Sequence, residues 1–312
     1  MDGRLQVFAG QSNRPLAEAI MQTLGTPLGR ATIGTFKNGE TRVHLEENVR
    51  GSDVFVIQSM QAPVNQNLME LLIMIDALRR SSAARITAVI PYYAYARQEK
   101  KTIGREPISA KLVANLLVTA GAQRILTIDL HAPAIEGFFD IPVDHLRAAP
   151  LLADYFRSQE LENLVVVSPD AGGVARAEDF RIRAGGDLAI IAKKRPQADR
   201  PEVIEMVGDV AGKTAVIVDD MISTGGTLIE ATELLLQRGA GEVYACAVHA
   251  LFADGAIQRM ASSGLRCAIV TDTVPVPECH RGGAIEILSV APLLAEAIMR
   301  IHKDLSISAL FT

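Results

Sequence analysis

The densest group of chemically useful residues lies in the segment 215–227, which reads AVIVDDMISTGGT. An apolar run ends in two adjacent carboxylates, Asp219 and Asp220, and a turn rich in hydroxyl groups and glycine leads into the next helix. Backbone N–H groups at such a turn and at a helix N-terminus can hold a phosphate, because glycine lets the backbone come close. The carboxylates can accept hydrogen bonds from two hydroxyl groups. The segment therefore predicts a site for a phosphorylated polyol.

The residues assigned to this site are Asp219, Asp220, Ser223, Thr224, Gly225, Gly226 and Thr227. Side chains alternate along a strand, so we expect one carboxylate to face the ligand and the other to support the turn. The alternative is an ordinary strand–turn–helix connection with a threonine N-cap, which needs no ligand.

Two clusters of basic residues also follow apolar runs. One lies within residues 92–111 (YYAYARQEKKTIGREPISAK), and the other is Lys193-Lys194-Arg195. A basic loop at a sheet edge suits a polyphosphate chain, and fixed cations stabilise the charge that develops during phosphoryl transfer. Taken alone, each cluster is more simply explained as a solvated surface segment.

Acidic residues and a histidine end two further runs. Asp129-Leu130-His131 follows an apolar stretch, and Asp170 lies in a glycine turn that reads SPDAGG. Residues i and i+2 of a strand share one face, so we expect the Asp129 carboxylate and the His131 imidazole side by side. An isolated Asp–His pair is more often a structural hydrogen bond than a metal site, and Mg2+ prefers oxygen ligands. The residues alone leave both interpretations open.

The elements that must position these residues are short apolar runs alternating with amphipathic stretches. Strands are predicted at residues 5–9, 54–58, 86–90, 125–128, 164–167, 188–191, 215–218, 243–248 and 267–271. Helices are predicted at residues 15–24, 67–81, 109–120, 150–159, 227–238 and 291–302. This alternation, with continuous β-branched strands, indicates parallel sheets covered by helices, with ligands bound beyond the carboxyl ends of the strands. Residues 35–45 (TFKNGETRVHL) predict a hairpin that turns at Asn38-Gly39.

The sequence contains an apparent internal repeat. Residues 115–131 (NLLVTAGAQRILTIDLH) match residues 233–249 (ELLLQRGAGEVYACAVH), with Gly121 aligned to Gly239. Each copy reads as a helix, a Gly-Ala turn and a strand. Two similar α/β halves would explain the match, although helix–glycine–strand connections resemble one another because glycine suits a helix C-cap.

Length and composition fit a globular protein of two domains. We expect these domains at 1–146 and 147–302, with the tail 303–312 able to pack back on the first. Of the 312 residues 49% are hydrophobic and 21% charged, and the net charge of −5 gives no indication of a nucleic-acid or membrane partner. The three cysteines are an odd number without C-x-x-C spacing, which argues against a disulfide framework and a zinc site. With no signal peptide or membrane span evident, the sequence predicts a soluble protein of the reducing cytoplasm.

Several of these segments resemble those of one enzyme family. VDDMISTGGT at 218–227 resembles the phosphoribosyl-diphosphate loop shared by phosphoribosyltransferases and ribose-phosphate diphosphokinases. ARQEKK at 96–101 resembles the ATP-binding loop of the diphosphokinases, and DLH at 129–131 is similar to their cation-binding segment. The resemblance covers almost the whole chain. It implies an α/β protein of two tandem, internally repeated phosphoribosyltransferase-like domains, each a mainly parallel sheet flanked by helices.

The resemblance also implies an activity, the transfer of the β,γ-diphosphate of Mg-ATP to O1 of ribose 5-phosphate, which gives phosphoribosyl diphosphate and AMP. It assigns Lys193 and Arg195 to catalysis. It assigns to ATP the residues Phe36, Asn38, Gly39, Glu40, Arg97 and Gln98. It assigns to the Mg2+ cofactor the residues Asp129, His131 and Asp170. It further implies a homo-oligomer, a hexamer in the family, whose active sites are shared between subunits.

The chain departs from the family pattern in two places. Ser223 stands where the family loop usually has aspartate, which with Gly225 makes the loop slightly more like that of a phosphoribosyltransferase, and we expect an altered affinity or rate. Gly104 replaces a serine of the phosphate and ADP regulatory site. The possible regulatory residues are Arg50, Arg105, Ser306, Ser308 and Phe311.

Two other functions remain possible at this point. A phosphoribosyltransferase would share the loop at 218–227 but has no reason to carry ARQEKK, DLH or a second matching half. A non-catalytic regulatory paralogue would be expected to have lost Lys193, Arg195 or His131, and all three are present. Release of AMP from ATP and ribose 5-phosphate distinguishes the diphosphokinase from both.

Overall fold

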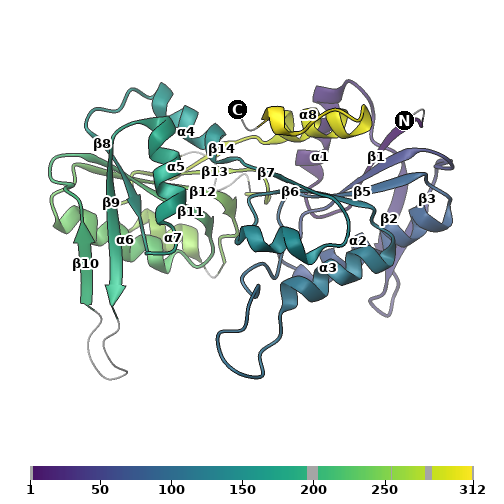
Figure 1. Cartoon of the computed structure of the whole chain (residues 1–312), viewed down its shortest axis with the longest axis horizontal. Coiled ribbons are helices and arrows are strands. Elements are labelled where there is room, and N and C mark those ends of the chain that lie inside the picture. The colour runs from purple at the N-terminus through teal and green to yellow at the C-terminus, as the bar shows by residue number, and fades with distance from the viewer. Residues whose placement is uncertain (1–2, 195–202, 254, 278–282, 311–312) are drawn as a thin grey trace. The chain divides into compact units, whose positions relative to one another are not determined.

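The computed structural model describes residues 3–194, 203–253, 255–277 and 283–310. They form two compact units, each with a main sheet between two layers of helices (Figure 1). Unit 1 is formed by the described parts of Met1–Arg147, Thr273–Pro275 and Ser289–Thr312, and unit 2 by those of Ala148–Asp272 and Val276–Leu288. None of the described helices is both long and apolar enough to span a membrane.

Unit 1 has a parallel sheet with the strand order β1-β4-β5-β6-β7. Its strands are β1 (Leu5–Ala9), β4 (Asp53–Ile57), β5 (Arg85–Ile90), β6 (Arg124–Ile128) and β7 (Val143–Leu146). Its helices are α1 (Arg14–Leu24), α2 (Val64–Arg80), α3 (Ser109–Ala120), α8 (Ala291–His302) and the 3-10 helices η1 (Pro133–Phe138) and η3 (Ser308–Leu310). Helices α1 and α8 cover one face and α2 and α3 the other, which explains why all of β4 is buried (Figure 1). The predicted hairpin is present as β2 (Ala31–Thr35) and β3 (Thr41–Leu45).

Unit 2 has a sheet with the strand order β10-β9-β8-β11-β12-β13-β14, in which only β10 is antiparallel to its neighbour. Its strands are β8 (Leu164–Ser168), β9 (Asp187–Lys194), β10 (Val203–Val207), β11 (Thr214–Ile222), β12 (Glu242–Ala250), β13 (Cys267–Thr271) and β14 (Ile285–Leu288). Its helices are α4 (Ala149–Ser158), α5 (Val174–Ala184), α6 (Gly226–Gln237) and α7 (Ala256–Ala261). Helices α4 and α5 lie on one face of the sheet and α6 and α7 on the other (Figure 1).

The two sheets repeat one pattern, strand by strand. The order β1-β4-β5-β6-β7 corresponds to β8-β11-β12-β13-β14, and an antiparallel pair of strands follows the helix after the first strand of each series. The register corresponds as well. Leu5 pairs with Asp53 and Leu164 pairs with Thr214, in each case at the first residue of both strands. The fold is therefore an internal duplication of an α/β unit.

The sequence match between residues 115–131 and 233–249 does not follow this duplication. It pairs α3 and β6 with α6 and β12, whereas the strand order equates β6 with β13 and β12 with β5. Both copies consist of a helix, a glycine with positive φ (126° at Gly121 and 88° at Gly239) and a strand. The match thus reflects two similar helix C-caps.

The final helix of each repeat belongs to the other unit. Helix α4 follows β7 in the chain but packs against α5 of unit 2, and α8 follows β14 but packs against α1 of unit 1. The end of α8 is also fixed to unit 1, because His302 Nδ1 lies 2.8 Å from the carboxylate of the buried Asp53. The structure therefore differs from the predicted division at 289–302, which lie in unit 1 together with the tail.

Candidate active site

Two turns at the carboxyl ends of neighbouring strands form the centre of the candidate site in unit 2. Because β8 and β11 are parallel and paired, the turn 169–173 before α5 and the turn 223–225 before α6 lie at the same edge of the sheet. Arg176 on α5 links this edge: its guanidinium lies 2.9 Å from Asp219 Oδ1 and 3.6 Å from Asp220 Oδ1. The edge thus holds two carboxylates around one cation.

The two carboxylates differ in exposure. The side chain of Asp219 is 32% exposed and that of Asp220 is 7% exposed, in keeping with the alternation expected along a strand. The Asp220 N–H donates to Asp219 Oδ1 at 2.8 Å. Burial and the neighbouring Asp220 carboxyl raise the pKa of Asp219 to about 7, and Arg176 opposes this rise. Asp219 is therefore the carboxylate that a ligand reaches more easily, and its charge depends on the groups around it.

The glycine turn before α6 is braced from outside. Gly225 has φ = 78°, in the left-handed region that favours glycine. Arg259 Nη2 donates to the Thr224 carbonyl at 2.6 Å, and the Ala253 N–H donates to the Ser223 carbonyl at 3.0 Å. These contacts hold the turn in shape.

The first turn of α6 is open to an anion. Its N-cap is Gly225, which has no side chain to cap the helix, so the alternative prediction of a threonine N-cap is wrong. The N–H groups of a first helical turn need partners from outside the helix, and a phosphate can supply them. Thr224 and Thr227 are exposed beside this turn and add two hydroxyl groups.

Asp170 orders the neighbouring turn before α5. Its Oδ1 accepts a hydrogen bond from the Gly173 N–H at 2.8 Å, and Ser168 Oγ donates to its carbonyl at 2.7 Å. A Cβ at Gly172 would lie 3.3 Å from the same carboxylate oxygen, so the turn closes tightly around the Asp170 side chain. These bonds explain the residue without a metal, and its metal role stays a prediction.

Lys193 lies on the part of β9 that runs past the end of β8. Ser168, the last residue of β8, pairs with Ile190, and Lys193 is three residues further along, opposite Ile204 of β10. Its backbone therefore lies beyond the carboxyl edge of β8, on the same side as the two turns. The side chain of Lys193 and the whole of Arg195 fall outside the described part of the structure.

In unit 1, Asp129, Leu130 and His131 form a turn after β6 and are not part of the strand. Asp129 has φ = 39°, so the strand alternation on which the predicted alignment of the two side chains rests does not apply here. The Asp129 N–H donates to the Leu146 carbonyl at 3.0 Å, and the Leu130 N–H donates to His145 Nε2 at 2.8 Å. Among the described residues, no group of three or more His, Cys, Asp or Glu side chains is placed to hold a metal ion.

Four predicted ATP residues form the tip of the β2–β3 hairpin, namely Phe36, Asn38, Gly39 and Glu40. The Phe36 N–H donates to the Glu40 carbonyl at 2.7 Å, and Gly39 has φ = 92°, as the predicted turn requires. Phe36 is 50% exposed, with the Arg42 guanidinium 6.0 Å from the centre of its ring. The tip thus presents an aromatic ring to solvent within this chain.

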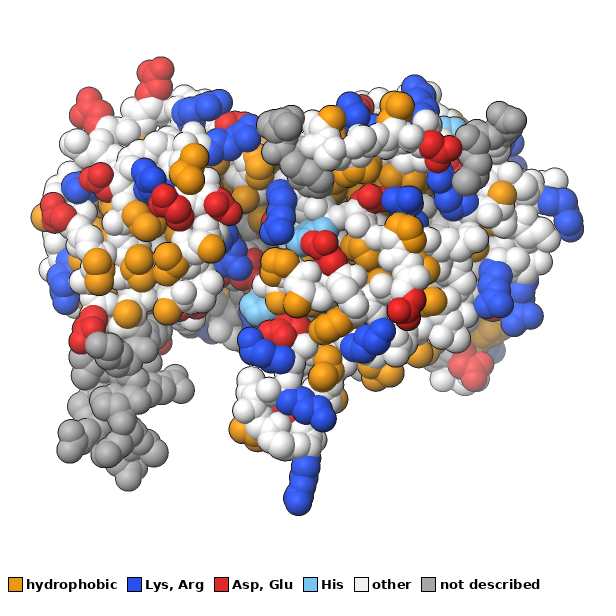
Figure 2. All heavy atoms as spheres, in the orientation of Figure 1, with side chains coloured by type: hydrophobic (Ala, Val, Ile, Leu, Met, Phe, Trp, Pro, Cys, Tyr) orange, Lys and Arg blue, Asp and Glu red, His pale blue; other side chains and the backbone are white. Residues whose placement is uncertain are grey.

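The segment between β5 and α3 carries the other two predicted ATP residues. It protrudes from unit 1 and bears Lys and Arg side chains at its tip (Figures 1 and 2). Gln98 is held near the base, where Ser109 Oγ donates to its Oε1. Glu106 closes the loop by accepting the N–H and the hydroxyl of Thr102, each at 2.8 Å. Arg97 is exposed on this segment, as a phosphate-binding arginine must be.

The predicted regulatory residues that the structure describes lie in unit 1. Arg50 and Arg105 are exposed, and Arg105 has φ = 71°. The hydroxyl groups of Ser306 and Ser308 lie 2.5 Å apart near the C-terminus. Phe311 falls outside the described residues.

Comparison with known proteins identifies the family. Residues 5–121 match the model of the N-terminal domain of ribose phosphate pyrophosphokinase, and residues 187–312 match that of the phosphoribosyl synthetase-associated domain. The chain is 54% identical to the ribose-phosphate pyrophosphokinase of Caldanaerobacter subterraneus subsp. tengcongensis over 309 residues, which cover 99% of this chain and 98% of that protein. It is 49% identical to the ribose-phosphate pyrophosphokinase of Corynebacterium ammoniagenes over 311 residues, or 100% and 98% of the two chains. The chain belongs to the ribose-phosphate pyrophosphokinase family.

A solved structure extends this result to the fold. The crystal structure of phosphoribosylpyrophosphate synthetase from Mycobacterium smegmatis matches with a TM-score of 0.92 at 49% identity, covering 96% of this chain and 99% of that chain. The family and the repeated two-domain α/β fold predicted from the sequence are confirmed. The match includes residues of both units.

Three residues at these turns were missed by the sequence analysis: Arg176, Arg259 and His145. Arg176 contacts the two aspartates from the neighbouring helix, Arg259 braces the glycine turn from α7, and His145 holds the turn after β6 from β7. Each acts on a segment that is remote in the sequence, so no local motif marks it.

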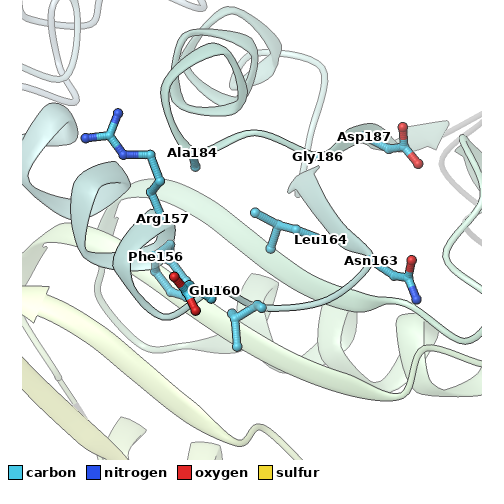
Figure 3. A pocket seen from close by; sticks show the side chains of 9 residues that line it. Phe156, Arg157, Glu160, Asn163, Leu164, Ala184, Gly186 and Asp187 are labelled. Carbon is cyan, nitrogen blue, oxygen red and sulfur yellow. The ribbon is translucent and has the colours of Figure 1, made fainter.

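The pocket drawn in Figure 3 lies away from these turns. It has a volume of about 430 Å3, and its lining includes Leu164 and Asp187, the first residues of β8 and β9. The amino ends of these parallel strands lie at the opposite edge of the sheet from the turns before α5 and α6. Ligands of open α/β sheets bind at the carboxyl ends, so this pocket is separate from the candidate active site.

Proposed function

We propose that the chain catalyses the ribose-phosphate diphosphokinase reaction, in which the β,γ-diphosphate of Mg-ATP moves to O1 of ribose 5-phosphate and AMP leaves. One observation carries this proposal: the uncapped first turn of α6 stands beside Asp219 and Asp220 in a chain whose full length matches this family. An anion can accept from the N–H groups of the turn, and the partly exposed Asp219 carboxylate can accept from hydroxyl groups. Ribose 5-phosphate supplies both in one small molecule.

The ribose 5-phosphate site is assigned to unit 2. The N–H groups of Gly226 and Thr227, with the hydroxyl groups of Thr224 and Ser223, bind the 5-phosphate. The partly exposed Asp219 carboxylate accepts hydrogen bonds from the ribose hydroxyl groups. Asp220, which is buried, supports the strand end with Arg176.

The ATP site is assigned to residues of unit 1. The exposed Phe36 ring offers a stacking surface for adenine, and Asn38 and Glu40 beside it offer hydrogen-bonding groups. Arg97 and Gln98 bind the phosphate chain. An aromatic ring exposed at a hairpin tip also suits contact with a neighbouring subunit, so we include a homo-oligomer, a hexamer as in the family, with shared active sites.

The Mg2+ enters as part of the Mg-ATP substrate. Asp129 provides a carboxylate, the type of ligand that Mg2+ prefers, and the carboxylate of Asp170 has an oxygen besides the one bonded to Gly173. His131 is exposed next to Asp129 and can bind through the water shell or the phosphates. The assignment of these residues to Mg2+ rests on the family resemblance, and a Mg2+ bound there would neutralise charge on the transferred group.

Transfer proceeds in line, with O1 of ribose 5-phosphate attacking the β-phosphorus. Lys193 and Arg195 stabilise the charge that develops on the bridging and equatorial oxygens. Positioning and charge neutralisation provide most of the catalysis, so no covalent intermediate is needed. The strand β9 supports this assignment, since it carries the Lys193 backbone past the carboxyl edge of β8.

The test is to identify the nucleotide product from Mg-ATP and ribose 5-phosphate. AMP formed in step with phosphoribosyl diphosphate is expected, and its loss in Lys193→Ala with unchanged thermal unfolding would support the catalytic assignment. ADP as the product would show γ-phosphoryl transfer and refute the proposal. No turnover, with nucleotide formed from phosphoribosyl diphosphate and a base, would instead identify a phosphoribosyltransferase.

Three accompanying proposals follow from the family. The cytoplasm is the proposed location, which agrees with free thiols at Cys246 and Cys267. The oligomer is tested by sedimentation of the purified protein, where a monomer would refute it. Regulation through Arg50, Arg105, Ser306, Ser308 and Phe311 is tested by titrating phosphate and ADP, and responses equal to those of an Arg50→Ala variant would refute it.

A further inference from the structure

His145 is a buried histidine of β7 whose two ring nitrogens bond in different directions. Its side chain is 3% exposed. The Leu130 N–H donates to its Nε2 at 2.8 Å, and its Nδ1 faces Glu136 of η1. The ring therefore connects the turn after β6, the 3-10 helix that follows and the last strand of the unit 1 sheet.

These bonds define the protonation state of the ring. A backbone N–H can only donate, so Nε2 must carry a lone pair, and the proton lies on Nδ1, which donates to Glu136. Burial lowers the pKa of His145, with a smaller contribution from the positive charge of Arg147, while Glu136 acts in the opposite direction. The imidazole is thus neutral near neutral pH, in the tautomer that accepts from Leu130.

The bonded turn is the one that presents Asp129 and His131. Asp129 has the left-handed φ of 39°, which is unfavourable for a residue with a side chain and needs support from its surroundings. Two successive N–H groups provide it: that of Asp129 donates to the Leu146 carbonyl, and that of Leu130 donates to His145 Nε2. Of these two bonds, only the second runs through a side chain. Loss of it would let the directions of the Asp129 and His131 side chains drift.

We propose that His145 is a positioning residue for Mg-ATP, because its Nε2 holds the Leu130 N–H and thereby fixes the turn that carries Asp129 and His131. This inference rests on the proposed function, in which these two residues bind Mg-ATP. The arrangement follows a general rule for ion sites, where the groups behind the ligands orient them and their loss costs activity. His145 itself touches neither substrate.

The experiment compares His145→Ala, His145→Gln and a control on the same strand. The Gln Oε1 can take the place of Nε2 as acceptor, whereas Ala removes it. Asp144→Asn is the control, because Asp144 is the preceding residue and bonds Arg124 Nη1 at 2.6 Å instead of the turn. In His145→Ala we expect the KM for Mg-ATP to rise by about 10–100-fold with the KM for ribose 5-phosphate nearly unchanged. His145→Gln should recover most of this loss, and Asp144→Asn should leave both constants near wild type.

Hydrogen exchange provides a measurement that does not depend on activity. The Leu130 amide should exchange faster in His145→Ala and regain protection in His145→Gln, as read by mass spectrometry of peptides that contain residues 129–132. Unchanged protection in His145→Ala, an equal rise in both KM values, or a defect in His145→Gln as large as in His145→Ala would each overturn the proposal. If the wild-type protein forms no AMP, the proposed function fails, and the exchange result still decides whether His145 holds the turn.

Discussion

The turn after β4 in unit 1 and the turn after β11 in unit 2 belong to equivalent strands, but the two are built differently. Because the two sheets share one register, Gln58 corresponds to Asp219 and Ser59 corresponds to Asp220. Gln58 is 1% exposed, whereas the Asp219 side chain is 32% exposed. An amide closes the turn in unit 1 at the position where unit 2 keeps a partly exposed carboxylate.

The turn in unit 1 is filled by side chains of the chain itself. Gln58 Oε1 accepts from the Ser12 N–H at 3.2 Å, and Gln58 Nε2 donates to Glu70 Oε1 at 2.8 Å. Glu70 is 2% exposed and also accepts from the Gln11 N–H at 2.7 Å. Glu70 thus supplies an acceptor from within the chain to N–H groups at this edge of the unit 1 sheet, whereas the corresponding edge of unit 2 is proposed to bind its substrate. The comparison teaches that the duplicated scaffold offers two places for a site, and that local side chains decide which one is used.

The largest expected effect comes from a substitution that distorts the glycine turn before α6 in unit 2. Gly225→Val places a β-branched residue at φ = 78°, which costs about 1–2 kcal/mol in that conformation, so the turn must rearrange. Loss of two or more charge-assisted bonds to the phosphate should raise the KM for ribose 5-phosphate by about 100-fold or more. Steady-state kinetics with each substrate varied will measure it.

A glycine after β1, beside the filled turn of unit 1, sharpens this test. A Cβ at Gly10 would lie 2.2 Å from Gln58 Oε1 and 2.6 Å from Glu70 Oε1, so Gly10→Ala should lower the unfolding temperature of the protein. It should not raise the KM for ribose 5-phosphate selectively. A wild-type KM in Gly225→Val, or a selective rise in Gly10→Ala, would contradict the division between an open turn and a filled one.

The next effect concerns Asp219, which stands in unit 2 where unit 1 has Gln58. Asp219→Asn makes the unit 2 position resemble that of Gln58 and removes a charged acceptor, which is worth about 1.5–3 kcal/mol, so the KM for ribose 5-phosphate should rise by about 10–100-fold. Asp209→Asn is the control, because its side chain is 74% exposed and lies 3.7 Å from Lys213. Isothermal titration with ribose 5-phosphate will compare the two variants. Equal affinity in Asp219→Asn and Asp209→Asn would show that Asp219 does not bind the sugar.

The filled turn should respond in stability and not in substrate binding. In Glu70→Gln the amide oxygen can still accept from the two N–H groups bonded to Oε1, but it carries no charge, so both bonds weaken. This should cost about 1–3 kcal/mol and lower the unfolding temperature by several degrees. Glu296→Gln is the control, since that side chain is 50% exposed and pairs with Arg300 within α8. Differential scanning fluorimetry measures both. A change in the KM for ribose 5-phosphate without a change in unfolding temperature would show that Glu70 belongs to a ligand site.

Much of the scaffold behind this comparison could be predicted from the sequence. All of the predicted strands and helices are present, because their apolar periodicity is local. Strands β7 and β14 were missed because they have four residues each, and α7 because it has six. The edge strand β10 (Val203–Val207) was also missed. Helix α5 (VARAEDFRIRA) was missed because its charged residues interrupt the apolar pattern. That last omission also hid Arg176.

The site could be predicted only where its chemistry lies in one segment. The glycine turn and its two aspartates are adjacent in sequence, whereas Arg176 reaches Asp219 only because β8 pairs with β11. His145 reaches the turn after β6 only because β6 pairs with β7. The bond between Gln58 and Glu70 likewise depends on the packing of α2. Strand pairing and helix packing create these contacts, and no local pattern encodes them.

The smallest expected effect is a pH-dependent one at Arg176. Burial and Asp220 raise the pKa of Asp219 to about 7 while Arg176 holds it down, so Arg176→Gln should raise that pKa further. The carboxylate accepts hydrogen bonds best when ionised, which is the state above its pKa. The KM for ribose 5-phosphate in the variant should therefore exceed that of the wild type by about several-fold near pH 6.5, where less of its Asp219 is ionised. It should approach the wild-type KM near pH 8.5, on the order of two units higher, where Asp219 is mostly ionised in both proteins.

The ratio of the two KM values isolates this effect, because the titration of the sugar phosphate, with a pKa of about 6, is common to both proteins. Arg181→Gln is the matched control: it lies on the same helix but pairs with Glu178 at 2.7 Å. The KM of Arg181→Gln divided by that of the wild type should stay constant between about pH 6.5 and 8.5, because an exposed ion pair contributes little. A flat ratio for Arg176→Gln as well would mean that Arg176 does not control the charge of Asp219. Binding at the turn before α6 would then depend on its backbone N–H groups and not on the charge of Asp219.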